Sequence, residues 1–114
     1  MYNIESQMFT EFLNQLPNVI KEEDFQEASE VWGGYHGRSE MVIEECSELI
    51  QAIMHERRIN KPGTKEEVLE ESCDVLFTVL NLIQTIGEPD TVFILQRKYD
   101  KFTDKLNKRR NMLL

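Results

Sequence analysis

Residues 64–86, TKEEVLEESCDVLFTVLNLIQTI, carry the pattern that decides the fold. Thr64 followed by Glu67 is typical of a capping box and predicts that a helix starts there. From Val75 onward, apolar side chains cover most of the circumference of this helix, which predicts a buried helix rather than one on a surface. Because isolated buried carboxylates are costly, its polar stripe should line a wet cavity or a site. The stripe consists of Glu71, Asp74, Thr78, Asn81 and Thr85.

The rest of the chain also has helical spacing, and the alternation of strands is absent. Glycine and proline end the helices, so we expect the first helix to stop before Pro17 and a later one to be capped by Ser39. The other expected helices lie at about 22–32, 39–57, 64–86 and 90–110. We therefore predict an all-α protein with an antiparallel bundle of the four-helix type, which oligomerisation completes. Residues 1–114 would form one domain, with a helical segment at 1–32 and the core helices at 39–110.

Two of these helices each carry a pair of carboxylates three residues apart, Glu45 with Glu48 and Glu71 with Asp74. Residues at this spacing share one helix face. The turn near Pro62 predicts a helical hairpin, which would bring the two pairs to about the same level. Four such carboxylates repel one another unless they hold a cation, and hard oxygen ligands suit Mg²⁺, with Mn²⁺ as the alternative. The sequence thus favours a metal-dependent reaction on a phosphate-bearing substrate, against the simpler reading of solvated helix faces.

The basic side chains of the last helix and Trp32 can each be interpreted either as substrate-binding groups or as structural groups. The last helix carries a basic stripe of Lys98, Lys101, Lys105 and Arg109. At least one of its three lysines binds phosphate, or the stripe complements the helix dipole and aids solubility. Trp32 either stacks on a base or packs in the core. The chain has no Glu-x-x-His, which argues against a di-iron bundle, and no phosphate-binding Gly-x-x-x-x-Gly-Lys loop.

Composition narrows the classes of protein. The net charge of −8 argues against general nucleic-acid binding. No signal peptide and no apolar run long enough for a membrane span is present in the sequence, so we expect a soluble, cytoplasmic protein. The two cysteines, Cys46 and Cys73, are expected to be free thiols.

The carboxylate motifs resemble those of the MazG-like all-α nucleoside triphosphate pyrophosphohydrolases. Glu44-Glu45-x-x-Glu48 followed by Glu71-x-x-Asp74 is similar to the family signature, Asn81 follows at a familiar spacing, and the similarity extends from Trp32 to Arg109. The resemblance implies hydrolysis of a nucleoside triphosphate to the monophosphate and pyrophosphate. It also implies a homodimer or homotetramer, and Mg²⁺ ligands at Glu45, Glu48, Glu71 and Asp74.

On this interpretation, water activated by the metal attacks the α-phosphate. The carboxylates Glu44, Glu45 and Glu48 are the candidate catalytic groups, and the sequence does not decide which takes the proton. Asn81 would bind sugar, base or a ligand carboxylate, and the lysines of the last helix would offset charge on pyrophosphate. Two alternatives stay open: a non-catalytic helical interaction protein, and a phosphatase or phosphodiesterase that acts on another phosphate ester. The identity of the nucleotide also stays open.

Overall fold

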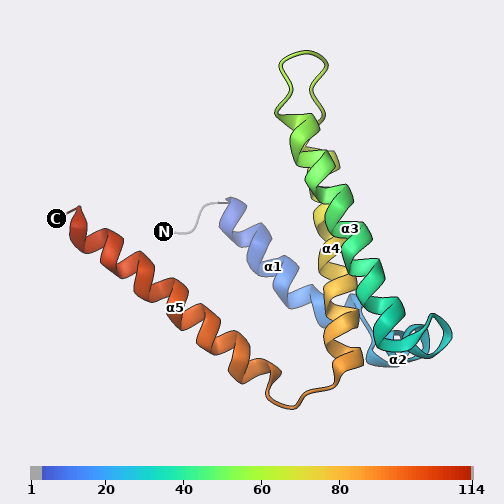
Figure 1. Cartoon of the computed structure of the whole chain (residues 1–114). Helices are drawn as coiled ribbons and strands as arrows, with labels where there is room; N and C mark the ends of the chain where they lie inside the picture. Colours follow the sequence, from blue (N-terminus) through green and yellow to red (C-terminus); the bar gives the residue numbers. More distant parts are fainter. Residues whose placement is uncertain (1–3, 114) are drawn as a thin grey trace.

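The computed structural model describes residues 4–113, with side chains from residue 7 onward, so residues 1–3 and 114 of the expected domain lie outside it. Every regular element in this part of the chain is a helix, which confirms the all-α class (Figure 1). None of these helices is both long and apolar enough to cross a membrane. The helices are α1 (Ile4–Val19), α2 (Glu22–Val31), α3 (Gly34–Glu56), α4 (Lys65–Ile86) and α5 (Thr91–Met112).

The centre of the fold is a hairpin of α3 and α4, which lie side by side and run antiparallel (Figure 1). Thr64 is the N-cap of α4 as predicted, since the Glu67 backbone N–H donates to the Thr64 hydroxyl over 3.1 Å. At the turn before it, the Gly63 N–H donates to the His55 carbonyl over 2.8 Å. α4 ends at Ile86 as predicted, and the next residue, Gly87, caps it with a φ of 68° that favours glycine. The hairpin therefore follows from local signals at both ends of α4.

Helix α2 packs against one end of this hairpin and contacts both of its helices. Its Phe25 is only 6% exposed, and its ring meets the Phe77 ring of α4 edge-on, with 5.1 Å between centroids. Edge-to-face packing at this separation is favourable for aromatic pairs. Phe25 thus fixes α2 beside the polar stripe of α4.

The predicted end of the first helix is wrong. Helix α1 passes through Pro17 and ends at Val19. Proline has a φ that suits a helix, and here it stands close enough to the end that the helix loses little beyond one hydrogen bond. The last turn is still closed, because the Ile20 N–H donates to the Leu16 carbonyl over 3.1 Å.

The predicted start of the third helix is wrong as well. α3 begins at Gly34, and Ser39 is inside it, where its hydroxyl donates to the His36 carbonyl over 2.8 Å. Gly33 makes this early start accessible with a φ of 91°. Gly37 is needed too, because a Cβ there would lie 1.8 Å from the Trp32 carbonyl oxygen. The glycines between the two expected helices thus let the chain turn tightly into α3.

One chain does not close the predicted bundle. In Figure 1, α5 diverges from the hairpin, and no residue of α5 is buried. Its apolar face, which includes Val92, Leu95, Tyr99 and Phe102, is exposed. Helix α4 is also only partly covered, with Phe77 52% exposed. Its buried residues are Thr78 and Asn81, so the polar stripe faces inward and apolar surface faces outward.

The dimensions quantify this open arrangement. The radius of gyration is 17.5 Å, whereas a compact chain of this length has about 13 Å. The accessible surface is 9935 Å², whereas a compact monomer of this mass exposes about 6,500 Å². The single chain therefore leaves a large apolar surface uncovered.

Candidate metal and nucleotide site

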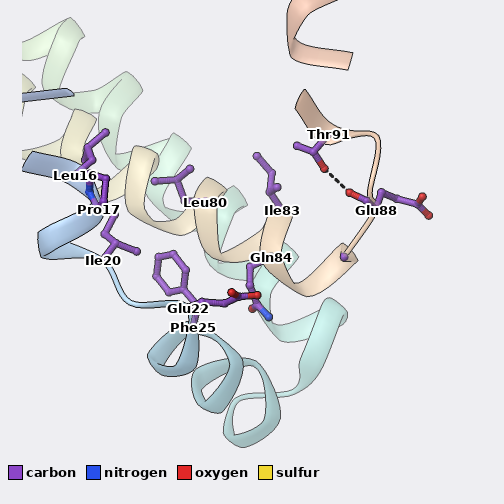
Figure 2. Close-up of a pocket in the computed structure, with 11 residues that line it drawn as sticks. Leu16, Pro17, Ile20, Glu22, Phe25, Leu80, Ile83, Gln84, Glu88 and Thr91 are labelled. Atoms are coloured by element: carbon purple, nitrogen blue, oxygen red, sulfur yellow. Dashed lines mark hydrogen bonds between the residues drawn. The ribbon is translucent and has the colours of Figure 1, made fainter. Parts of the chain in front are cut away.

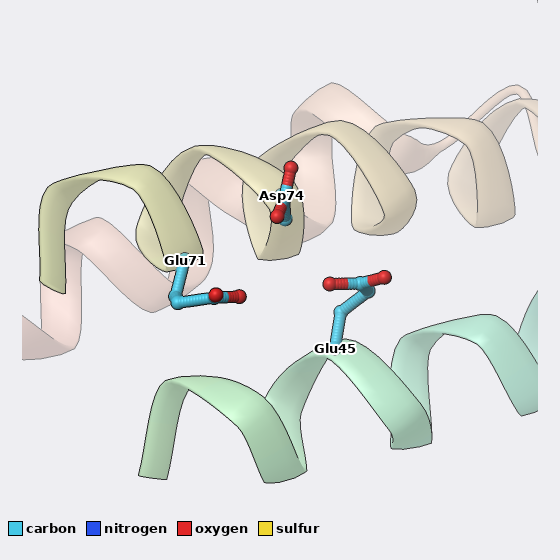
Figure 3. Close-up of side chains that lie close together, drawn as sticks. All are labelled: Glu45, Glu71 and Asp74. Carbon is cyan, nitrogen blue, oxygen red and sulfur yellow. The ribbon is translucent and has the colours of Figure 1, made fainter. Parts of the chain in front are cut away.

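The hairpin brings together carboxylates from both predicted pairs. Glu45 of α3 and Glu71 and Asp74 of α4 each offer an oxygen, and these three oxygens lie within 4.8 Å of one another. Figure 3 shows Glu45 pointing from one helix toward the two carboxylates of the other. Glu45 and Glu71 are partly buried, whereas Asp74 is exposed. The three therefore form an acidic cluster between α3 and α4 that is open on one side.

The electrostatics of this cluster are unfavourable when it holds no cation. Burial raises the pKa of Glu45, and the charges of Glu48 and Asp74 raise that pKa further. Burial and the same two charges also raise the pKa of Glu71. One oxygen of each of these glutamates is buried and accepts no hydrogen bond within the described part of the chain. A proton or a cation would relieve both the repulsion and the missing partners.

The remaining predicted carboxylates lie near the cluster or outside it. Glu48 is exposed, but it is close enough for its charge and a side-chain hydrogen bond to raise the pKa of both Glu45 and Glu71. Glu44 is also exposed on α3, and it does not belong to the trio of converging oxygens. Glu48 thus borders the acidic cluster. Glu44 is the residue directly before Glu45 on α3 and lies outside the cluster.

A cavity of about 430 Å³ opens beside the cluster. Glu45 and Asp74 form part of its wall, and Trp32 forms another part, as a base-stacking role would require. A volume of this size falls within the usual range for small-molecule sites, which combine apolar walls with a few polar groups. The remaining lining residues are Arg38, Met41, Phe77 and Thr78.

Sequence reasoning missed Arg38 as a site residue. Its side chain is only 8% exposed, its Nη1 donates to the Asn81 Oδ1 over 3.3 Å, and its guanidinium lies 5.4 Å from the centroid of the Trp32 ring. A signal was present, because Arg38 precedes Glu45 by seven residues, and this spacing puts both residues on one helix face. That signal was hidden because the predicted helix starts only at Ser39.

Asn81, which is predicted to bind sugar, base or a ligand carboxylate, has protein partners in this structure. It is 2% exposed, and its Nδ2 donates to the Phe25 carbonyl over 3.1 Å while its Oδ1 accepts from Arg38. Both ends of the amide are therefore engaged by the protein. In this structure Asn81 positions Arg38 and ties α4 to α2.

The predicted basic stripe is not at the acidic cluster. Lys98, Lys101 and Lys105 are exposed on α5, which diverges from the hairpin (Figure 1). Lys98 instead borders a separate cavity of about 320 Å³ between the end of α4 and the start of α5. Within one chain, the structure does not bring these lysines together with the carboxylates.

A further cavity of about 590 Å³ lies between α1, α2 and α4, where α5 begins. Figure 2 shows that apolar side chains such as Leu16, Ile20 and Leu80 dominate its wall. It shares no lining residue with the cavity at the acidic cluster. We therefore place the chemistry at the smaller cavity, where carboxylates converge.

Comparison with known proteins gives one match. The family model described as MazG nucleotide pyrophosphohydrolase domain matches residues 36–114. The match spans both carboxylate pairs, Arg38 and the whole of α5. No curated protein and no solved structure matches the chain.

Proposed function

Because the chain belongs to the MazG nucleotide pyrophosphohydrolase family, we propose that it hydrolyses a nucleoside triphosphate, ribo or deoxy, to the monophosphate and pyrophosphate with Mg²⁺ as cofactor. The observation that carries this proposal is the convergence of three carboxylate oxygens, within 4.8 Å, at the edge of a cavity of about 430 Å³. Carboxylate oxygens are the ligands that Mg²⁺ prefers, and Mn²⁺ accepts them too. The raised pKa values of Glu45 and Glu71 support the need for a cation there.

Each residue has a proposed role. Glu45, Glu71 and Asp74 would hold the cation, with Glu48 as a fourth ligand from the border of the cluster. When bound, Mg²⁺ would neutralise triphosphate charge and lower the pKa of the attacking water. A carboxylate of the α3 motif, Glu44, Glu45 or Glu48, would take the proton of that water as it attacks the α-phosphate. Trp32 would hold the base against the cavity wall.

A second copy of the chain is part of this proposal. The apolar faces of α4 and α5 are exposed in one chain, and an exposed apolar surface of this extent is typical of an interface. A homodimer or homotetramer would cover it. We propose that assembly also brings Lys98, Lys101 or Lys105 of one copy to the cavity of another, where a cation would offset charge on the pyrophosphate.

The experiment that tests the reaction is product analysis. The purified protein would be incubated with each common ribo- and deoxynucleoside triphosphate and Mg²⁺, and ion-exchange chromatography would separate the products. We expect monophosphate and pyrophosphate in equal amounts, and no product in the presence of chelator. Release of inorganic phosphate would instead indicate a phosphatase, whereas a phosphodiesterase would leave the triphosphates intact and cleave a phosphodiester. A protein that binds no divalent cation and turns over no nucleotide would be the non-catalytic interaction protein.

Stability should depend on pH in a way that Mg²⁺ abolishes. Since the pKa values of Glu45 and Glu71 are raised, the folded chain binds more protons than the unfolded chain just above the ordinary glutamate pKa of 4.5. Folding stability in chelator should therefore fall as pH rises through the raised pKa values. Thermal unfolding at about pH 5 and about pH 8 measures this fall, and Mg²⁺ should reduce it by stabilising the charged cluster at the higher pH.

The Glu45→Gln/Glu71→Gln double variant is the control, because other carboxylates also titrate in this range. In chelator, the parent should lose more stability than the variant between the two pH values. Mg²⁺ should raise the melting temperature of the parent alone. Equal pH dependence in both proteins would contradict the electrostatic reading of the cluster.

A further inference from the structure

The Arg38 guanidinium is buried but incompletely paired. Its side chain is 8% exposed, and Nη1 has Asn81 Oδ1 as its acceptor. The buried Nε has no acceptor in the part of the chain that the structure describes. No carboxylate within residues 7–113 forms an ion pair with Arg38. A buried donor of this kind is costly unless something else supplies an acceptor.

The guanidinium is also held in one orientation. The Trp32 ring covers it at 5.4 Å. Asn81 cannot turn away easily, because its Nδ2 donates to the Phe25 carbonyl over 3.1 Å. Neutral partners on two sides fix the position of Arg38 without neutralising its charge. Such a preorganised donor loses little conformational freedom when it binds a ligand.

Arg38 lies in the wall of the cavity that also contains Glu45 and Asp74. Arg38 and Glu45 are two turns apart on one face of α3, which corresponds to about 10 Å along the helix axis. A nucleotide whose phosphates lie at the carboxylates would therefore extend its base toward Arg38 and Trp32. This step rests on the proposed function, because it takes the cavity as the nucleotide site.

An arginine has N–H donors and no acceptor, in a planar fork. It matches a base edge with two neighbouring acceptors, as in its pairing with O6 and N7 of guanine. Hypoxanthine has the same two acceptors, and cytosine has O2 beside N3. Adenine puts its amino donor beside N7, and uracil has an N–H at N3 beside each carbonyl. These differences divide the common bases into two groups.

We propose that Arg38 determines base specificity, and that this chain prefers nucleotides of guanine, hypoxanthine or cytosine over those of adenine or uracil. The shared property of the preferred group is a pair of adjacent acceptors. The bases would supply the acceptors that Arg38 lacks, and Trp32 would stack on their faces.

The test uses the fluorescence of Trp32, the single tryptophan of the chain. Nucleoside monophosphates in Mg²⁺ would be titrated against the whole protein, because they are not substrates of the proposed reaction. GMP should bind at least about ten-fold more tightly than AMP. CMP should bind more tightly than UMP by a similar factor. IMP should bind with about the affinity of GMP. Comparing the purines with each other and the pyrimidines with each other shows which of the preferred bases the cavity admits.

The variant Arg38→Gln should reverse the purine preference, because glutamine has a donor and an acceptor that match N6 and N7 of adenine. Arg58→Gln, the same change at an exposed residue after α3, should keep the preference of the parent. Thermal unfolding checks that each variant folds. If Arg38→Gln does not fold, the binding of GMP against AMP and of CMP against UMP by the parent still tests the proposed base preference.

Equal binding of GMP and AMP together with equal binding of CMP and UMP by the parent would overturn the proposal, and so would a preference for AMP or UMP. Pyrophosphate release from the triphosphates, measured in parallel, keeps the two proposals separate. Turnover without base preference overturns the role of Arg38 alone. Selective binding without turnover of any triphosphate supports Arg38 and contradicts the proposed reaction.

Discussion

Glu71→Gln should lower the rate of pyrophosphate release by at least about 100-fold, because loss of a residue outside the first coordination sphere already costs 10- to 100-fold in metal-dependent activity. Glu71 has one buried oxygen without a hydrogen-bond partner in the described part of the chain. A glutamine of the same shape keeps the packing but removes the charge that the cation needs. Steady-state turnover at saturating Mg²⁺ measures the effect.

Glu70→Gln is the matched control. Glu70 is the exposed neighbour of Glu71 on α4 and does not belong to the converging trio, so its variant should retain the activity of the parent. Circular dichroism should show the same helix content in all three proteins. Near-normal activity of Glu71→Gln, or equal losses in both variants, would contradict the assignment of Glu71 as a ligand.

Stability separates the enzyme from the non-catalytic alternative. In chelator, Glu71→Gln should be at least as stable as the parent, because it relieves the repulsion that raises the pKa of Glu71. Both hypotheses share that result. Only the enzyme hypothesis predicts that Mg²⁺ stabilises the parent and leaves the variant nearly unchanged, because a ligand stabilises the state that binds it.

The hairpin and its acidic cluster could be predicted because their signals are local. Thr64 and Glu67 cap one helix, Gly87 ends it, and spacings of three residues orient the carboxylates. The raised pKa values of Glu45 and Glu71 agree with that prediction. No tertiary information was needed to place these side chains on facing sides of two neighbouring helices.

The bonds of Arg38 and Asn81 could not be predicted, because they join parts of the chain that are distant in sequence. Asn81 bonds to Phe25, 56 residues away, and to Arg38, 43 residues away. Periodicity identifies a polar stripe on α4 but not which helix faces it. The place of α2, fixed by the packing of Phe25 on Phe77, decided that Asn81 faces protein and not the cavity.

The position of α5 could not be predicted for a different reason. Its apolar face has the period of a packed helix, and the sequence does not say whether the partner helix belongs to the same chain or to another. The structure shows this face uncovered in one chain. The same pattern on α4, with Thr78 and Asn81 inside and Leu76 and Ile86 outside, has the same explanation.

Phe102→Asp should break the assembly that we propose. Phe102 is 59% exposed on the apolar face of α5, with its ring 6.0 Å from that of Tyr99. Surface beyond that of a compact monomer amounts to roughly 3,400 Å² per chain, which is more than the roughly 1,000–2,500 Å² per partner that an obligate interface buries. Burial of a phenylalanine contributes about 1.5–3 kcal/mol, so a charge in its place should weaken association by at least about ten-fold.

Light scattering after size-exclusion chromatography measures the mass of each protein. The parent should elute as a dimer or tetramer, and Phe102→Asp should elute at a lower mass and melt at a lower temperature. Asn107→Asp adds the same charge to an exposed polar position of the same helix, and it should keep the mass of the parent. A monomeric parent at micromolar concentration would contradict the assembly. If Phe102→Asp is monomeric and keeps full turnover, the lysines of α5 do not serve the cavity of another copy, because that role requires the two chains to meet.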